Sequence, residues 1–165
     1  MTQGLASFPT TDLNDAYPDK VRAVLLPLRD FGAKRAFAGR IRTAVTMEDT
    51  KLVHELFATP GKGDVIVLDG GGSTRTALLG DRMADRLIFN GWAGIVINGA
   101  VRDRQALAEL PLGVKALGTT PVRSAKTGIG AIDIPVAFGN VLFAPGQCIY
   151  CDEDGILVSD EPLNL

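Results

Sequence analysis

The pattern of hydrophobic and polar positions along the middle of the chain predicts a layered α/β fold. Short continuous apolar runs at 64–69, 93–98 and 114–117 are typical of buried strands. Between these runs, apolar residues recur at helical spacing, which predicts helices over 81–90 and 104–110. Strand and helix therefore alternate as β-α-β-α-β, which indicates a sheet with some parallel pairing and helices packed against it.

The two ends of the chain carry different patterns. Toward the N-terminus, we expect a short helix over 12–16, an alternating strand over 37–45, and a helix from Asp49 or Thr50 to Ala58. Residues 74–79 read as a second short strand or turn. The last third predicts a β-meander or small barrel, since turn residues separate apolar runs at 132–138, 141–143, 147–151 and 156–158.

Composition then narrows the class of protein. The 165 residues suit one domain spanning 1–165, and no repeat or linker divides them. With 17 Lys and Arg against 19 Asp and Glu, the chain lacks the basic excess of nucleic-acid binders. Residues 1–13 lack the features of a secretory signal, and no apolar run reaches the ~18 residues of a membrane span. We therefore expect a cytoplasmic protein that binds neither nucleic acid nor membrane.

Histidine and cysteine are too scarce for several kinds of site. A single histidine, His54, excludes a multi-histidine zinc site within one chain, and its place on a predicted helix suggests a surface or boundary residue. Cys148 and Cys151 match the C-x-x-C spacing of redox proteins, but they fall in a predicted strand. There, residues three apart point to opposite faces, so we expect buried structural thiols.

Several motifs of other protein classes fail on inspection. Gly70-Gly71-Gly72 follows a strand, but Arg75 stands where the dinucleotide-binding fingerprint needs a glycine. Lys126-Thr127 lacks the glycine of a phosphate-binding loop, and no Gly-x-Ser-x-Gly supports a hydrolase. Without a glycine-rich cofactor fingerprint, a methyltransferase is also rejected. Residues 152–155 resemble a calcium loop only at its start and are interpreted as a hairpin turn.

One constellation of polar groups remains, at two successive strand ends. Gly80-Asp81-Arg82-Met83 begins one predicted helix, and Arg102-Asp103 begins the next. Unpaired amides at the first helix start would bind an anion, Arg102 would clamp a carboxylate, and Asp103 would offer an oxygen ligand to Mg²⁺. The same residues also fit a simpler interpretation, in which Asp81 and Asp103 cap helices and Arg102 forms a surface ion pair.

Three segments resemble the ribonuclease-regulator-A-like family, which includes class II 4-hydroxy-4-methyl-2-oxoglutarate aldolases and oxaloacetate decarboxylases. They are Val67-Leu68-Asp69-Gly70-Gly71-Gly72-Ser73, Ala77-Leu78-Leu79-Gly80-Asp81 and Asn98-Gly99-Ala100-Val101-Arg102-Asp103. Further matches follow in order through most of the chain, at 31–32, 37–39, 112–118, 126–130 and 152–156.

The resemblance implies a layered β/β/α swivelling-type domain, with a mixed sheet or small barrel flanked by helices. It also implies a homotrimer, or a hexamer of paired trimers, with active sites between subunits. By position, Gly80, Asp81, Arg82, Met83 and Arg102 would bind the pyruvyl group of a small 2-oxo acid. Asp103 would hold a divalent cation, Mg²⁺ or Mn²⁺, and Asp81 would orient or activate a water as acid and base.

Two functions follow from the resemblance. The first is a metal-dependent carbon–carbon lyase that cleaves 4-hydroxy-4-methyl-2-oxoglutarate and decarboxylates oxaloacetate through a common pyruvate enolate. No sequence signal marks a buried Schiff-base lysine, which favours the metal-dependent route. The alternative is a non-enzymatic inhibitor of the endoribonuclease RNase E. Members with that role lack the aspartate after the arginine, so the Arg102-Asp103 pair favours the lyase.

Overall fold

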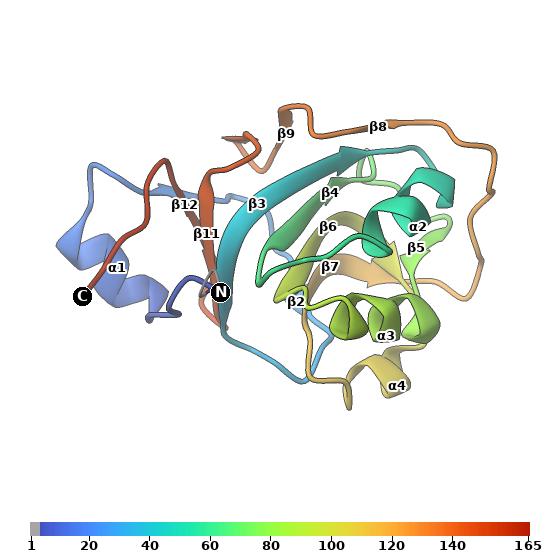
Figure 1. Ribbon diagram of the computed structural model, residues 1–165, viewed down its shortest axis with the longest axis horizontal. Coiled ribbons are helices and arrows are strands. Elements are labelled where there is room, and N and C mark those ends of the chain that lie inside the picture. The colour runs from blue at the N-terminus through green and yellow to red at the C-terminus, as the bar shows by residue number, and fades with distance from the viewer. Residues whose placement is uncertain (1–3) are drawn as a thin grey trace.

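The computed structural model describes residues 4–165, and a curled mixed sheet lies at its centre (Figure 1). Four parallel strands form the middle of this sheet, in the order β3 (Phe37–Val45), β4 (Val65–Asp69), β6 (Gly94–Val101) and β7 (Gly113–Thr119). The short strand β5 (Ala77–Leu79) pairs in parallel with the end of β6. The predicted βαβ pattern is thus confirmed, and the carboxyl ends of β5 and β6 lie side by side.

Antiparallel strands continue the sheet on both sides and curl it into a half-barrel. They are β11 (Cys148–Cys151), β12 (Ile156–Ser159), β1 (Arg22–Ala23), β2 (Arg29–Asp30) and β8 (Ala131–Ile132). Strand β3 joins the two halves, because residues 37–40 pair with β11 and residues 41–45 pair with β4. A separate hairpin consists of β9 (Val136–Phe138) and β10 (Val141–Phe143).

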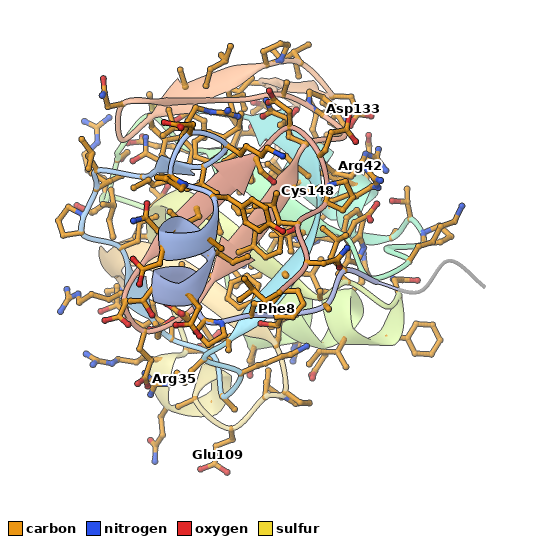
Figure 2. The ribbon with its side chains drawn as sticks, turned by 90° about the vertical axis from the view of Figure 1, so that its left-hand side faces the viewer. Phe8, Arg35, Arg42, Glu109, Asp133 and Cys148 are labelled. Atoms are coloured by element: carbon orange, nitrogen blue, oxygen red, sulfur yellow. The ribbon has the colours of Figure 1, made fainter. Side chains whose placement is uncertain are left out.

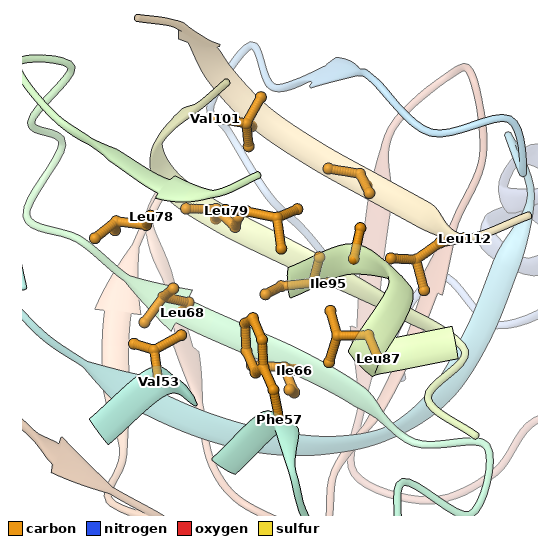
Figure 3. Packing of buried hydrophobic residues seen from close by; sticks show 14 of the residues in the cluster. Val53, Phe57, Ile66, Leu68, Leu78, Leu79, Leu87, Ile95, Val101 and Leu112 are labelled. Carbon is orange, nitrogen blue, oxygen red and sulfur yellow. The ribbon is translucent and has the colours of Figure 1, made fainter. Parts of the chain in front are cut away.

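Three helices cover one face of the parallel strands, namely α2 (Lys51–Phe57), α3 (Asp81–Phe89) and α4 (Arg104–Leu107). In Figure 3, Val53 and Phe57 from α2 and Leu87 from α3 pack over Ile66 and Ile95 of the sheet. All five side chains are buried, and removing them from water stabilises this layer. Among the described residues, no helix has the length and apolar character needed to cross a membrane.

The sheet has two further cores, which lie on opposite faces of β11. One is enclosed by the β9–β10 hairpin and includes Phe37, Val96 and Phe143. The other lies under α1 (Thr10–Ala16), which packs on the outer face of β11 and β12 (Figure 2). The helices and the two sheet layers together give the layered α/β architecture that the sequence predicts.

Some element boundaries differ from the prediction. The predicted strand over 132–138 is interrupted between β8 and β9, because Pro135 has no N–H for pairing and Asp133 has a left-handed φ of 58°. The helix predicted over 104–110 ends at Leu107. Strand β6 continues past Asn98 to Val101 through a register shift. That extension carries Arg102 to the edge of the sheet, beside the end of β5.

Both cysteines are buried, and they lie on opposite faces of β11 as predicted. Cys148 packs in the core beneath α1, whereas Cys151 packs in the core beneath the hairpin. Burial raises the pKa of each thiol, which disfavours the reactive thiolate. The arrangement fits structural thiols and leaves the two sulfurs unable to pair within the strand.

We therefore expect neither thiol of the native protein to react with a chromogenic disulfide reagent. Addition of denaturant should release two thiols per chain, because both side chains become exposed only on unfolding. The measurement is thiol titration before and after unfolding. Rapid reaction of one thiol in the folded protein would contradict this assignment.

Lys115 is a buried lysine that the sequence pattern did not predict. Its Nζ lies 3.2 Å from Oδ1 of Asp30 and donates to the backbone carbonyl of Asp152. These partners balance its charge between β7, β2 and the turn after β11. Lys115 is not among the residues lining the pocket described below, so it is a structural lysine rather than a Schiff-base candidate.

Candidate functional site

A pocket of about 490 Å³ lies at the carboxyl ends of β5 and β6. In open α/β sheets this edge is where ligands bind. The predicted site residues all line it, namely Gly80, Asp81, Arg82, Met83, Arg102 and Asp103. Asp81 and Asp103 also line an adjoining open hollow next to α4. The structure thus brings together the two segments that sequence analysis singled out, while the roles of their residues remain predictions.

Asp103 has an unusual backbone conformation that directs its side chain. Its φ of 59° and ψ of 41° lie in the left-handed region, which is sparsely populated by residues other than glycine. Although it stands at the start of α4, its carboxylate makes no capping bond there. Instead, Oδ2 of Asp103 accepts the backbone N–H of Asp81 at 3.1 Å. The carboxylate therefore caps α3, the preceding helix.

We call the side of the pocket formed by Gly80–Met83, Arg102 and Asp103 the first wall. Arg102 and Asp81 complete it. The backbone N–H of Arg102 donates to the carbonyl of Leu79, which fixes the chain beside β5. Nε of Arg102 lies 3.9 Å from Oδ2 of Asp103, and the two side chains are 40% and 39% exposed. The carboxylate Oδ1 of Asp81 accepts the N–H of Arg82 at 2.7 Å. The ion pair considered from sequence is thus present, and so is a carboxylate of Asp81 at the start of α3, whereas Asp103 does not cap α4 as that interpretation expected.

The anion site expected at the start of α3 is smaller than predicted. Two of its first amides, those of Asp81 and Arg82, are already bonded to carboxylates. Among residues 4–165, the backbone N–H of Met83 has no acceptor. One helix amide therefore stays free for a ligand oxygen, next to the guanidinium of Arg102.

Gly80 leaves the space that the Asp103 carboxylate occupies. Its φ of −130° is extended backbone that any residue adopts, so the need for glycine is steric. A Cβ at position 80 would lie 2.7 Å from Oδ2 of Asp103 and 3.4 Å from Nε of Arg102. An added methyl group would therefore displace the two side chains that define this wall.

We expect Gly80→Ala to lower the rate of the reaction proposed below at least tenfold, because it displaces side chains of the first wall. Stability should change little, because these side chains are half-exposed. Activity and thermal unfolding should be measured side by side. Gly118→Ala is the matched control, since a Cβ there meets only Nη2 of Arg29 at 3.7 Å. Equal activity of the two variants would contradict this role for Gly80.

The first wall suits a divalent cation held mainly by water. Within the described residues, no group of three or more His, Cys, Asp or Glu side chains is arranged to hold a metal. Mg²⁺ needs only one or two protein carboxylates and keeps several waters. Oδ1 of Asp103 has no hydrogen-bond donor from residues 4–165, so one hard oxygen remains available on a half-exposed carboxylate. The donor set therefore fits such an ion through Asp103.

A second wall of the pocket contains residues that sequence analysis did not assign to the site. They are Thr50 and His54 from the start of α2, and Arg123, Ser124 and Lys126 from the segment after β7. Burial, with the positive charges of Lys126 and Arg86, lowers the pKa of His54 below 6.5. His54 is half-buried, as expected of a boundary residue, and the lowered pKa favours its neutral imidazole.

The sequence contained a weak signal for this wall. Lys126-Thr127-Gly128 fails as a phosphate-binding loop, but it belongs to one of the segments that match the family. Hydrophobic periodicity does not mark it, because residues 120–130 form neither helix nor strand in the structure. Only the folded chain shows that Lys126 and His54 line the same pocket as Arg102.

Comparisons with known proteins find relatives that match most of the chain. A family model described as RraA-like, Aldolase/RraA, matches residues 10–158. An Azotobacter vinelandii protein with the provisional name 4-hydroxy-4-methyl-2-oxoglutarate aldolase is 46% identical over 158 residues, which cover 96% of this chain and 98% of that protein. A Pseudomonas syringae protein of the same provisional name is 48% identical over 156 residues, covering 94% and 96%.

One similar solved structure, from Thermus thermophilus, is described as the RNA-processing inhibitor RraA. Its TM-score is 0.92 at 45% identity, and the match covers 96% of each chain. A structure from Geobacillus kaustophilus, described as an S-adenosylmethionine: 2-dimethylmenaquinone methyltransferase, has a TM-score of 0.93 at 43% identity. That match covers 94% of this chain and 97% of the other.

Proposed function

The chain belongs to the Aldolase/RraA family, and on that premise we propose that it is a divalent-metal-dependent carbon–carbon lyase acting on small 2-oxo acids. The proposed reactions are retro-aldol cleavage of 4-hydroxy-4-methyl-2-oxoglutarate and decarboxylation of oxaloacetate. The observation that carries the proposal is the Arg102-Asp103 pair, which lies in the pocket beside the start of α3. Relatives named as the aldolase support the lyase class.

The side chains of the first wall have separate roles in this reaction. Arg102 binds the C1 carboxylate of the 2-oxo acid, and the free N–H of Met83 donates to a substrate oxygen. The carboxylate of Asp81 accepts, through a water molecule, the proton of the C4 hydroxyl group. As the C4 carbonyl forms, the C3–C4 bond breaks and its electron pair passes into the enolate of pyruvate. Protonation at C3 then gives pyruvate.

Asp103 would hold the divalent cation, Mg²⁺ or Mn²⁺, with water completing its coordination. When bound, such a cation supplies positive charge that offsets the negative charge developing on the 2-oxo oxygen. Arg102 adds a fixed positive charge on the same side of the pocket. Oxaloacetate loses CO₂ from C4 to give the same enolate, and this reaction needs no base at a C4 hydroxyl. One site therefore supports both reactions.

The test is pyruvate release from oxaloacetate, measured for the wild type with and without EDTA and for Asp103→Ala. We expect chelation to abolish pyruvate release and added Mg²⁺ or Mn²⁺ to restore it. The rate of pyruvate release by Asp103→Ala should be at least a hundredfold lower than that of the wild type. Asp85→Ala on the exposed face of α3 is the control and should keep full activity. Activity that survives both EDTA and Asp103→Ala would reject the proposal.

The same proposal includes assembly into a homotrimer, or a hexamer of paired trimers, in the cytoplasm. The pocket and the adjoining hollow are open in the single chain, which leaves room for residues of a neighbouring subunit. Sedimentation analysis tests this directly. We expect a species of three or six times the 17.4 kDa mass of the chain.

A second candidate function is regulation of RNase E by direct binding, without catalysis. The observation that favours it is the likeness to the Thermus thermophilus protein described as an RNA-processing inhibitor. A binding protein does not need the Arg102-Asp103 pair in a pocket. Capture of purified RNase E by the wild type and by Asp103→Ala, alongside the oxaloacetate assay, separates the two functions.

A further inference from the structure

The charged side chains of the pocket have an excess of positive charge. Arg82, Arg102, Arg123 and Lys126 contribute four cations, whereas the carboxylates are those of Asp81 and Asp103. A substrate bound through one carboxylate at Arg102 leaves the charges of the second wall unmatched. Such a pocket favours a ligand with a further negative charge away from its 2-oxo acid group.

The second wall is fixed to the sheet by hydrogen bonds on either side of Arg123. The backbone N–H of Ala77 donates to the carbonyl of Val122 at 2.7 Å. The hydroxyl of Ser124 donates to the carbonyl of Ala77 at 2.8 Å and lies 2.6 Å from the hydroxyl of Thr76. Because Ser124 is buried, Arg123 stands on a segment held against β5.

Lys126 is fixed on both sides by the residues before α2. The N–H of Ala125 donates to the carbonyl of Glu48, and the carbonyl of Ala125 accepts the N–H of Thr50. On the other side, the N–H and the hydroxyl of Thr127 both donate to Oδ2 of Asp49, at 2.6 and 2.5 Å. The backbone of Lys126 therefore has little freedom, although its side chain is exposed.

Asp49 is a buried carboxylate whose partners are all hydrogen-bond donors. Only 1% of the residue is exposed, and its Oδ1 also accepts the N–H groups of Lys51 and Gly128, at 3.0 and 3.1 Å. Across the described residues, no lysine or arginine forms an ion pair with it. A buried charge that is stabilised by neutral backbone and hydroxyl donors is a costly feature, and here it joins the start of α2 to the segment carrying Lys126.

We infer that Arg123 and Lys126 form a binding site for the distal carboxylate of a dicarboxylic 2-oxo acid, and that Asp49 is the positioning residue that holds this site in place. The inference rests on the proposed function. In 4-hydroxy-4-methyl-2-oxoglutarate, the distal carboxylate is C5, attached to the carbon that leaves. Holding it orients the C3–C4 bond while Arg102 holds the other end of the molecule. The two walls thus bind the two ends of one substrate.

The experiment compares two aldol substrates that differ only in this group. The first is 4-hydroxy-4-methyl-2-oxoglutarate, and the second is 4-hydroxy-2-oxopentanoate, in which a hydrogen atom replaces the C5 carboxylate. The variants are Lys126→Met and Arg123→Met, which keep an apolar stem and remove the charge. Arg86→Met is the matched control, because Arg86 also acts on His54 but does not line the pocket. Exchange of the methyl protons of pyruvate in D₂O measures enolate formation without any distal group.

We expect Lys126→Met and Arg123→Met each to lower the preference for the dicarboxylate by about tenfold or more, through KM rather than kcat. Exchange of pyruvate protons and cleavage of the monocarboxylate should stay within about twofold of wild type, as should every activity of Arg86→Met. Equal losses on both substrates, or an unchanged preference, would overturn the inference. If the wild type neither exchanges pyruvate protons nor cleaves either substrate, the proposed function itself fails.

Asp49 is tested through Thr127, which avoids removing the buried charge. Thr127→Val deletes one donor to Asp49 and should raise KM for the dicarboxylate severalfold while leaving pyruvate exchange unchanged. Thr127→Ser keeps the hydroxyl and should restore the wild-type KM. A variant pair that changes only thermal stability, with identical KM values, would show that Asp49 has no part in substrate binding.

Discussion

Replacing Arg102 with methionine should lower kcat/KM for oxaloacetate by about a thousandfold. The guanidinium is the one cation of the first wall that adjoins Asp103, with its Nε 3.9 Å from that carboxylate. In the proposed reaction it binds the C1 carboxylate and also stabilises the charge that develops on the neighbouring oxygen. Loss of a single such donor typically costs two to three powers of ten in rate, so the methionine variant should fall at the upper end of that range.

The lysine variant makes this prediction more specific. Arg102→Lys keeps the positive charge but loses the planar pair of donors, and should recover only part of the lost activity. Both variants should unfold within about 0.5 kcal/mol of wild type, since 40% of the side chain is exposed. Steady-state kinetics and thermal unfolding of the three proteins provide the measurement. A methionine variant within tenfold of wild type would exclude Arg102 from the reaction.

Much of the sheet could be predicted from the sequence because buried parallel strands leave continuous apolar runs. Residues 65–68 and 95–97 are fully buried, and their apolar runs are clear in the sequence. The two-residue strands β1 and β2 have no such pattern, because their residues are half-buried or exposed. Their pairing depends on long-range contacts with β12 and β7, which no local window contains.

The first wall of the site was predictable for a related reason. Gly80 to Met83 and Arg102-Asp103 directly follow two apolar runs, so adjacency along the chain placed them at one sheet edge. The sequence did not predict the left-handed backbone of Asp103, which directs its carboxylate to α3 instead of α4. A local pattern of residues identifies a polar group at a helix start but not which helix it caps.

The second wall was not predictable because its defining contacts are distant in sequence. Asp49 and Thr127 are 78 positions apart, and the local sequence predicts for Asp49 only a place at the start of a helix. That prediction is partly right, since Asp49 accepts the N–H of Lys51 in the first turn of α2. Its three other hydrogen bonds go to Thr127 and Gly128, and these join the two regions that form the pocket wall.

Asp49→Asn should destabilise the fold by about 3 kcal/mol at pH 7, equivalent to roughly 10 °C in Tm. Burial opposes ionisation of Asp49, but its four hydrogen bonds outweigh that effect and hold its pKa well below the ordinary 3.8. The asparagine variant keeps one acceptor oxygen and places an NH₂ group against donors. Glu55→Gln, an exposed carboxylate on the same helix, is the control and should change stability by less than about 0.5 kcal/mol.

The pH dependence of this loss distinguishes the charge of Asp49 from its shape. A carboxyl group whose folded pKa is depressed stabilises the native state above its unfolded pKa, and that stabilisation is lost as pH falls toward the folded value. The gap in unfolding free energy between wild type and Asp49→Asn should therefore be constant from pH 7 to about 5, then narrow below about pH 4. Other depressed carboxyl groups, such as Asp152, are present in both proteins and cancel in the difference. Urea unfolding from pH 7 to 2.5 measures it, and a gap that stays constant to pH 2.5 would mean that the ionised form of Asp49 does not hold the segment carrying Lys126.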